Sequence, residues 1–545
     1  DQALRLPNYQ NMYGGGYGFD TIWYSQNPEA FPNRESGYYE GTHDGQADSY
    51  DLMAQYPVDE SWGPKLDGQM YRPWYSWQEQ IPEYYGKNVA WSPQPDNVKD
   101  FFKTGQTWTN NIALTGGNEV AFFRLSYSNL HQFGIMPNSE MKKNTINFNG
   151  STKLGKKLTA FTNITYVNTA TQGRPRTGYD GDNVMQQFNQ WGQRQWDNDK
   201  MEKYWRNGDG THNTWNRTSW NNPFPKYTDN PYWTRYMNYE NDGRNRLYGN
   251  VGLTWEIIKD LTFTIKYNKD YYTDRREERI AVGSNNISSY SEAIREFTEN
   301  NAEFLLQYKK YINDDWYIEA DFGGNQRTNK YYRNEAATNG GLPIPEFYNL
   351  ANTTNPVSII DYYETKRVNS LYARFSVGFK SMLYLDLTGR NDWSSTLPDG
   401  SNSYFYPSVT ASWVFSELAG LKELSWFSFG KIRAGYAMVG NDTDPYRIYD
   451  TYRAKENFGS NPLYTVPNPK NNQELEPEVT KSWEVGADLR FFQNRLGLDI
   501  AYYNLNTSQL IFPVTVSGAT GNSSTIINAG EMVNKGVEIL LYGTP

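Results

Sequence analysis

The stretch from Gly249 to Ile257 reads GNVGLTWEI, and the chain continues with LTFTIKYN from Leu261 to Asn268. In both runs apolar and polar residues alternate one for one. A period of two sends neighbouring side chains to opposite faces of a β-strand. Each run therefore predicts a strand with one apolar face and one polar, partly charged face.

The same alternation recurs along most of the chain. Further strands are predicted at residues 121–128, 158–166, 304–308, 316–322, 371–379, 383–387, 409–415, 432–438, 483–491, 496–502 and 537–541. A soluble sandwich shows this pattern in a few strands. Its repetition here favours a wall with lipid on one side and water on the other, which is a transmembrane antiparallel β-barrel of the all-β class.

The connections between the predicted strands alternate between short and long. The short ones, at 258–260, 313–315, 380–382 and 493–495, carry residues typical of tight turns. The long ones are predicted at 169–246, 269–300, 324–369, 440–478 and 505–533. Outer-membrane barrels have this asymmetry, with short periplasmic turns and long extracellular loops. A β-propeller is the alternative, but its period of about 40 to 50 residues is not found in this sequence.

Composition excludes several classes of protein. Apolar residues make up 37% of the chain, and no stretch approaches the run of about 20 that a membrane helix needs. The net charge of −9 argues against nucleic-acid binding, which requires clustered Lys and Arg. The absence of Cys excludes disulfides and thiolate metal sites. Aromatic residues reach 16%, as in the girdles of barrels and in sugar- or peptide-binding surfaces.

The first part of the chain, residues 1–107, has little periodicity and is rich in Tyr, Trp, Pro and Gly. It is predicted to be an aromatic-rich extracellular excursion or early barrel segment, and residues 108–545 to be barrel strands with long loops. A short helix is predicted from Asp96, ended by Gly105. The chain has no initiating Met and ends in a strand-like pattern, so we interpret it as a fragment.

The predicted loop 169–246 supplies the candidate substrate-binding residues. Rings alternating with amide and guanidinium groups suit stacking and hydrogen bonding to an oligosaccharide or an extended peptide. The candidates are Trp191, Trp196, Trp205, Trp215, Trp220 and Trp233. The alternative interpretation is that these rings pack the loop against itself or against a partner.

Other polar groups give no sign of catalysis. The acidic pairs at 180–182, 314–315 and 442–444 lack the spacing of a calcium loop and are interpreted as turns. The three His residues are scattered, so we expect no metal site, no cofactor and no enzymatic triad. The charges on the polar strand faces are expected to pair across neighbouring strands. They are Arg374, Lys380, Asp386, Arg390, Glu484, Asp488 and Arg490.

Several segments resemble one known family. They are residues 60–68, 94–105, 111–118, 123–128, 134–139, 389–392, 406–408, 433–436, 440–441, 528–531 and 534–538. These landmarks are similar, in content and order, to those of the SusC-like TonB-dependent transporters of Bacteroidetes outer membranes, and they span residues 7–539. The combination of these segments in this order is far more specific for the family than any one segment alone.

The resemblance implies a barrel of about 22 strands in the outer membrane. It implies an active importer of oligosaccharides or oligopeptides, with glycans favoured, driven by TonB through an N-terminal region and plug domain that this chain does not contain. It also implies a SusD-like surface lipoprotein as a lid and a dimer of such pairs. The alternatives are a passive porin or adhesin barrel and a soluble carbohydrate-active β-protein. Apolar stripes such as residues 371–379 argue against the soluble β-protein.

Overall fold

The computed structural model describes residues 4–544, and its largest unit is one antiparallel sheet of 15 strands. Within the sheet each strand pairs with the next one along the chain. The strands are β6 (Gln106–Gly117), β7 (Ala121–Phe133), β8 (Glu140–Lys153), β9 (Leu158–Arg174), β12 (Glu240–Ile258), β13 (Leu261–Ile280), β14 (Ser289–Tyr311), β15 (Trp316–Asn339), β16 (Asn355–Phe379), β17 (Leu383–Ser394), β18 (Ser403–Trp413), β19 (Phe427–Asn441), β23 (Glu478–Phe491), β24 (Leu496–Ser508) and β27 (Glu531–Gly543). The predicted antiparallel wall is confirmed.

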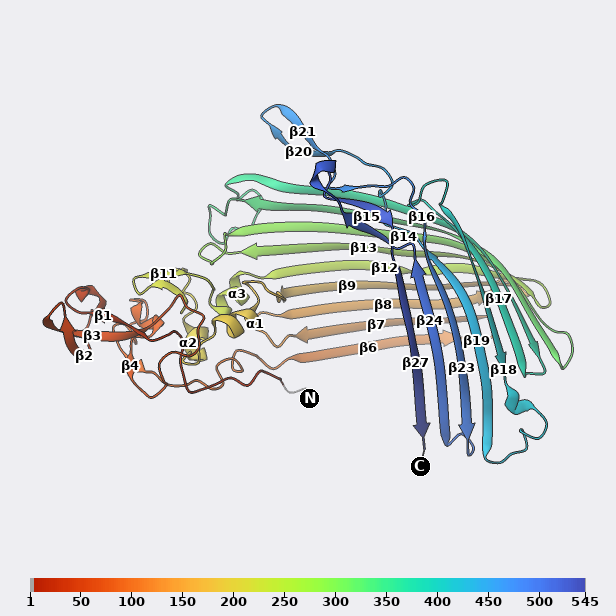
Figure 1. Ribbon diagram of the computed structural model, residues 1–545, viewed down its shortest axis with the longest axis horizontal. Helices are drawn as coiled ribbons and strands as arrows, with labels where there is room; N and C mark the ends of the chain where they lie inside the picture. Colours follow the sequence, from red (N-terminus) through yellow and green to blue (C-terminus); the bar gives the residue numbers. More distant parts are fainter. Residues whose placement is uncertain (1–3, 545) are drawn as a thin grey trace.

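The sheet coils strongly along its width. In Figure 1, β6 to β9 run across the view while β23, β24 and β27 run down it. Apolar side chains form cross-strand rows on one face, which we call the outward face. In one row Leu253 lies opposite Ile265, and Ile265 lies opposite Phe304. The register set by the alternating sequence therefore places a continuous apolar surface on one side of the wall.

All four short turns predicted from the sequence are present. Asp260, Lys380 and Gln493 have positive φ angles of 71°, 51° and 57°, as tight connections require. At the turn before β15, the side-chain oxygen of Asn313 accepts hydrogen bonds from the backbone N–H groups of Asp315 and Trp316. These turns lie together at one end of the strands, and the long connections lie at the other.

The strands are longer than predicted on the long-loop side. Residues 269–280, 289–300, 324–339 and 355–369 were expected in loops, but they continue β13 to β16, with one register shift between Ala337 and Asn339. The prediction failed because these segments are polar on both faces, so no alternation marks them. A membrane-crossing strand needs only about 9–11 residues, and β14 to β16 have 23 to 25. Their upper halves therefore stand in water beyond the membrane.

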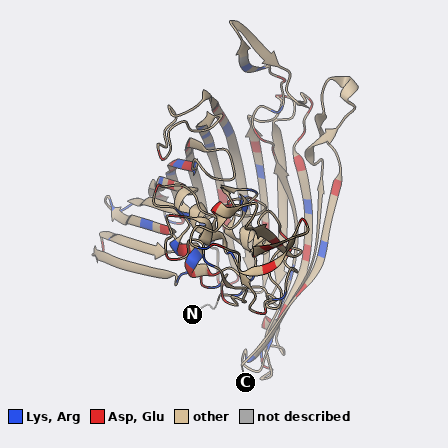
Figure 2. Ribbon diagram, turned by 90° about the vertical axis from the view of Figure 1, so that its left-hand side faces the viewer, with Lys and Arg blue, Asp and Glu red and all other residues tan. Residues whose placement is uncertain are grey.

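Charged residues of the opposite, inward face pair with one another, as expected. Arg374 lies 2.9 Å from Asp386 and 3.4 Å from Glu319 on the two neighbouring strands. Arg490 and Asp488, by contrast, pair at 2.8 Å within β23 and not across strands as expected. Figure 2 shows basic and acidic residues close together along the strands. The inward wall is thus polar without a strong excess of either charge.

A second part of the molecule lies beyond the long-loop ends of β6 to β9 (Figure 1). We call it the aromatic lobe; it consists of residues 4–105 and 175–239. Its elements are β1 (Phe19–Trp23), β2 (Tyr39–His43), β3 (Gln46–Ala54), β4 (Met70–Tyr71), β5 (Val89–Ala90), β10 (Arg217–Ser219), β11 (Asn222–Pro225), α1 (Val184–Gln186), α2 (Asn198–Lys203) and α3 (Pro231–Met237), with short 3-10 turns at 28–30 and 74–77 and a π-helical turn at 187–191. Among the described residues, no helix has the length and apolar character to span a membrane.

The predicted helix at 96–105 is wrong. Residues 95–101 form successive turns, with a single helix-type bond from the N–H of Asp100 to the carbonyl of Asp96. The segment is held instead by contacts with the rest of the lobe. Phe101 is fully buried, and its ring lies 5.0 Å from those of Phe188 and Tyr232. Tertiary packing of Phe101 replaces the helix that its local sequence favours.

The two last long connections carry small sheets of their own. Residues 442–477 contain the hairpin β20 (Arg453–Phe458) and β21 (Asn461–Thr465), which projects from the wall, and β22 (Pro469–Lys470). Residues 509–530 contain β25 (Ile511–Thr515) and β26 (Ser524–Asn528). β22 pairs with β26, so the two connections are joined.

Candidate functional site

The aromatic lobe is fastened to the wall by a buried arginine. Arg235 on α3 donates hydrogen bonds to the carbonyl of Pro137 at 3.1 Å and to that of Gly173 at 2.5 Å. Pro137 lies in the loop between β7 and β8, and Gly173 at the end of β9. Only 1% of Arg235 is exposed. The lobe is therefore held over the long-loop ends of these strands rather than tethered flexibly.

The structure separates the six predicted tryptophans into four groups. Trp196 and Trp215 pack together, with ring centroids 4.3 Å apart, and both are buried. Trp205 and Trp233 form a second pair at 5.9 Å. The two remaining rings pack separately: Trp191 stacks on Tyr227, and Trp220 packs on Trp77. Most of these contacts are within the lobe, which is the packing role weighed from the sequence.

Trp196 and Trp215 also line a cavity of about 300 Å³ inside the lobe, which we call the lobe cavity. Its aromatic lining is Tyr56, Tyr71, Trp74, Tyr75, Tyr84, Trp196 and Trp215. Its polar lining is Ser92, Gln94, Gln193, Gln195, Asp197 and Lys200. This volume is at the lower limit of small-molecule sites, so the cavity has room for one residue of an oligomer and not for a long chain.

The chemistry of the lobe cavity suits an uncharged polar ligand. Burial raises the pKa of Tyr71 and Tyr75, so both phenols stay protonated and can donate hydrogen bonds. Asp197 caps α2 by accepting from the N–H groups of Asp199 and Lys200. The ammonium of Lys200 lies 4.7 Å from the centre of the Tyr84 ring. Ring faces, donors and acceptors therefore surround the same small space.

A buried polar cluster supports the lobe next to α3. The side-chain amide of Asn238 donates to Asp182 at 3.0 Å and to Asp229 at 3.2 Å. His212 stacks on Trp233, with ring centroids 4.4 Å apart, and its Nε2 accepts from the N–H of Asn230 at 3.1 Å. Burial raises the pKa of both carboxyl groups and lowers the pKa of His212 to about 3.

This cluster predicts that acid weakens the lobe through His212. The folded lobe keeps the ring neutral, whereas the unfolded chain binds a proton below about pH 6.5. The unfolded state then holds more protons, so the contribution of His212 to stability falls as pH decreases from about 6.5 towards 3. Asp182 and Asp229, whose pKa values are raised, act in the opposite direction. The effect must therefore be measured against a variant that lacks the titrating ring.

The comparison is between the full-length protein and its His212→Gln variant, with protease cleavage of the lobe followed in urea from pH 7.5 to 5. The stability difference between the two proteins is expected to shrink by about 2 kcal/mol over this range. Parallel pH curves for the two proteins would contradict a neutral buried His212.

The inward wall carries a second candidate surface, a polar hollow of about 470 Å³ between β14 and β19. Arg390 is central to it: the guanidinium donates to Asp392 at 2.9 Å, Ser370 at 2.7 Å and Tyr406 at 2.8 Å. Other lining residues are Glu299, Asn301, Glu303, Asn325, Arg327, Tyr372, Tyr404, Asn441 and Asp442. Such a surface can exchange hydrogen bonds with a hydroxyl- or amide-rich solute.

Sequence reasoning missed most of both surfaces. The five aromatic residues of the lobe cavity that come from residues 1–105 were seen only as composition, because no period or motif selects them. Glu299, Asn325 and Arg327 in the polar hollow were assigned to loops. These residues could have been found by extending the antiparallel pairing of β13 to β16 beyond their apolar segments.

The fold and these surfaces define the class of the protein: an outer-membrane β-barrel wall with an apolar outward face, a polar inward face and a structured lobe at its long-loop end. Residues 188–544 match the family model described as TonB dependent receptor-like, beta-barrel. The chain belongs to this family.

Individual relatives agree with this assignment. The chain is 25% identical over 452 residues to TonB-dependent receptor P26 of Formosa agariphila, covering 80% of the chain and 43% of the relative. It is 22% identical over 523 residues to TonB-dependent receptor SusC of Bacteroides thetaiotaomicron, covering 88% and 49%. The solved RagAB peptide transporter has a similar fold, with a TM-score of 0.69 at 18% identity over 83% of this chain and 50% of that chain. The chain thus spans about half the length of these relatives or less.

Proposed function

We propose that this chain is part of an active importer of oligomeric nutrients, oligosaccharides or oligopeptides, that works with TonB and a SusD-like lipoprotein lid. The observation that carries the proposal is the aromatic lobe, a folded body with its own cavity, fastened to the long-loop rim of a polar-walled barrel; in the proposal this lobe lies outside the cell. A passive pore needs no such body. Membership of the TonB dependent receptor-like family supports the energised mechanism.

In this proposal the solute is captured outside and passes along the inward wall. One residue of the oligomer enters the lobe cavity against Trp196 and Trp215, and the rest lies over the barrel mouth. The polar hollow around Arg390 then supplies exchangeable hydrogen bonds further in. The chain alters no covalent bond of its cargo. Glycans are the favoured class, because ring faces combined with neutral donors suit sugar rings.

Uptake of labelled oligosaccharides and oligopeptides by cells carrying the full-length protein tests the import function. Uptake of one class is expected to be abolished by a protonophore, whereas a passive porin would remain active. The variant Ala90→Trp fills the lobe cavity from its exposed edge and is expected to reduce uptake about tenfold or more, since one oligomer residue loses its site. Trp426→Ala, at the opposite end of the barrel, is the matched control.

Two outcomes would contradict parts of this proposal separately. Normal uptake by Ala90→Trp would remove the lobe cavity from the transport path while leaving the importer intact. Uptake that ignores the protonophore would favour the passive porin.

The lid is proposed to dock on exposed aromatic side chains of the lobe and the long loops, as large rings anchor protein interfaces. Tyr17, Trp62, Tyr452 and Phe458 are all at least 70% exposed. Purification in mild detergent is expected to recover a surface lipoprotein at near-equal stoichiometry, and a dimer of such pairs. Recovery of the barrel alone would count against the lid.

A further inference from the structure

The outward face contains one region where short side chains replace the large apolar ones. Gly150 and Thr152 on β8 lie opposite Thr162 and Ala160 on β9, and Ala121 on β7 lies opposite Thr152. These five residues belong to the same outward rows as Leu253 and Ile265. The floor of this region is therefore lower than the surface on either side.

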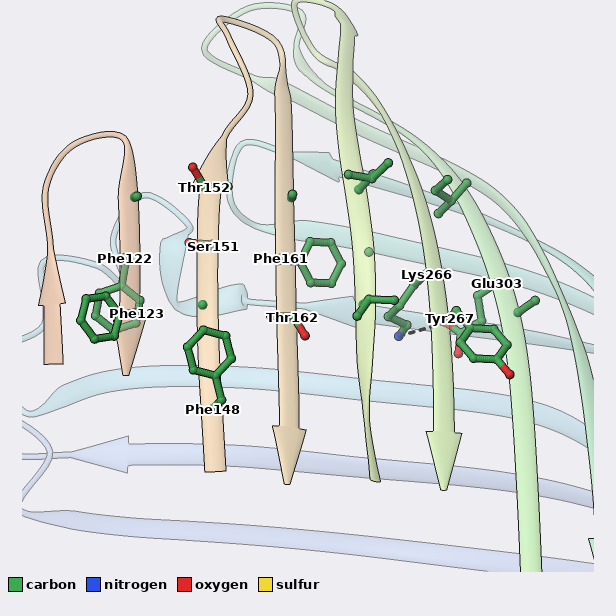
Figure 3. Close-up of a pocket in the computed structure, with 18 residues that line it drawn as sticks. Phe122, Phe123, Phe148, Ser151, Thr152, Phe161, Thr162, Lys266, Tyr267 and Glu303 are labelled. Carbon is green, nitrogen blue, oxygen red and sulfur yellow. Dashed lines mark ion pairs between the residues drawn. The ribbon is translucent and has the colours of Figure 1, made fainter. Parts of the chain in front are cut away.

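Large side chains stand around this floor. Phe123 and Phe148 lie on one side, and Val251, Leu253 and Tyr267 on the other. Together they border a shallow, open hollow of about 900 Å³, which we call the outward groove. Figure 3 shows Phe123 and Phe148 at one side and Tyr267 at the other, with Thr162 and the ring of Phe161 on the strand between them. The ion pair between Lys266 and Glu303, 3.0 Å apart, belongs to the inward face.

The outward groove continues towards the short turns. A second hollow of about 500 Å³ shares Leu253 and Ile265 with it and extends to the turn at 154–157. Trp255 and Phe263 form the wall of this lower part. The two hollows together make one apolar channel that runs from the middle of the membrane to its periplasmic edge.

Basic side chains gather at the periplasmic mouth of the channel. Lys156 and Lys157 line the lower hollow and are exposed. Lys157 also donates to the carbonyl of Ile257 at 2.8 Å, which holds it over the channel. Lys259 is exposed in the next turn, and the acidic residues nearby are Asp260 in that turn and Glu256, whose N–H donates to the carbonyl of Lys157. The mouth therefore carries a net positive charge.

We propose that the outward groove is a binding site for one phospholipid of the periplasmic leaflet. Its acyl chains fill the channel over the short side chains, and its phosphate lies between Lys156 and Lys157. Hydrocarbon must cover this face in the membrane, and a hollow that is left unfilled loses contacts on one side. A hollow this large holds a whole lipid chain rather than single methyl groups. Lysines at the mouth of a membrane groove are the groups that recognise lipid phosphates.

The proposal rests on the barrel fold and is independent of the transported nutrient. It is tested with the full-length protein purified in mild detergent, by counting phospholipid per chain with mass spectrometry. The wild type is expected to retain about one phospholipid through washes that remove general lipid. Ala160→Phe with Thr162→Phe fills the floor and is expected to lower retention about tenfold or more. Lys156→Gln with Lys157→Gln is expected to weaken retention about fivefold for each lysine.

A separate outward hollow of about 440 Å³, the third on this face, offers a matched control. It is lined by Trp413, Ala411 and Ala434, and Lys380 in its turn lies 3.9 Å from Asp315. Ala434→Phe is expected to leave lipid retention unchanged. Should the phenylalanine pair prevent assembly, which heat-dependent migration on a gel reports, the lysine pair carries the test.

Three results would overturn the proposal. Equal retention by wild type and both groove variants would show that the lipid lies elsewhere. Loss of an oligomer, with lipid retention unchanged, would assign the groove to a second copy of the chain. Displacement of the lipid by inorganic phosphate alone would show that the lysines form a free anion site and that the channel adds nothing.

Discussion

Phe375→Arg is expected to abolish most assembly of the barrel in the outer membrane. Phe375 lies on the outward face of β16, opposite Ala320 and Leu387 in the neighbouring strands. It stands four residues from the short-turn end of the strand, which is about half the height of the apolar band. An arginine at this depth costs about 2–4 kcal/mol, with no partner to compensate it.

The measurement is the fraction of full-length protein that reaches the outer membrane in the heat-modifiable folded form. Thr410→Arg is the control, because Thr410 faces inward directly opposite Asp386, where a new cation finds a partner. Normal assembly of Phe375→Arg alongside Thr410→Arg would mean that the apolar face of this wall does not meet lipid.

Arg72→Met is expected to unfold the first half of the aromatic lobe. Arg72 is fully buried and donates to the carbonyl of Ala30 at 2.8 Å, to Ser76 at 2.8 Å and to Asp51 at 3.2 Å. Its guanidinium also lies 3.9 Å from the centre of the Trp77 ring. Removing it leaves buried acceptors unpaired, and breaking a buried ion pair from one side costs about 3–5 kcal/mol.

Limited proteolysis of the lobe in urea measures this effect. Lys103→Met is a matched control, because the pair of Lys103 with Glu202 at 2.8 Å is exposed on both sides and contributes at most about 1 kcal/mol. Arg34 also pairs with Asp51, and the N–H of Tyr38 and the amide of Asn88 donate to the same carboxylate, so Asp51 keeps these partners in the variant. Equal protease resistance of the two variants would show that these remaining partners satisfy Asp51.

The wall was predictable because its sequence repeats a simple physical constraint. One side of each strand meets lipid, so Leu371 to Phe379 alternates visibly, and the turn at Lys380 carries the residues that a tight connection needs. The same constraint ends where the membrane ends. The strand segments beyond the membrane meet water on both faces. Residues there, such as Lys330 and Lys366, are kept in register only by hydrogen bonding to the next strand. No local feature of the sequence marks these segments as strands.

The candidate site was less predictable. Trp196 and Trp215 were selected by residue type, and the structure places them in one cavity. Their neighbours Tyr56 and Tyr75 come from a segment more than a hundred residues away in sequence. Contacts of this kind depend on tertiary packing. Composition could show that the lobe was aromatic, but it could not show which rings enclose a space.

The unequal strand lengths give the rim two different mechanical properties. On one side β14 to β16 rise as a continuous ladder, hydrogen-bonded up to Ser291 and Ala337. On the other side β17 and β18 have only 12 and 11 residues, and irregular loops complete the height. The loops on the low side are themselves packed, because Leu397 and Leu475 are buried there in one cluster with Ile526. One edge of the rim therefore depends on backbone hydrogen bonds for its stiffness, and the other depends on side-chain packing.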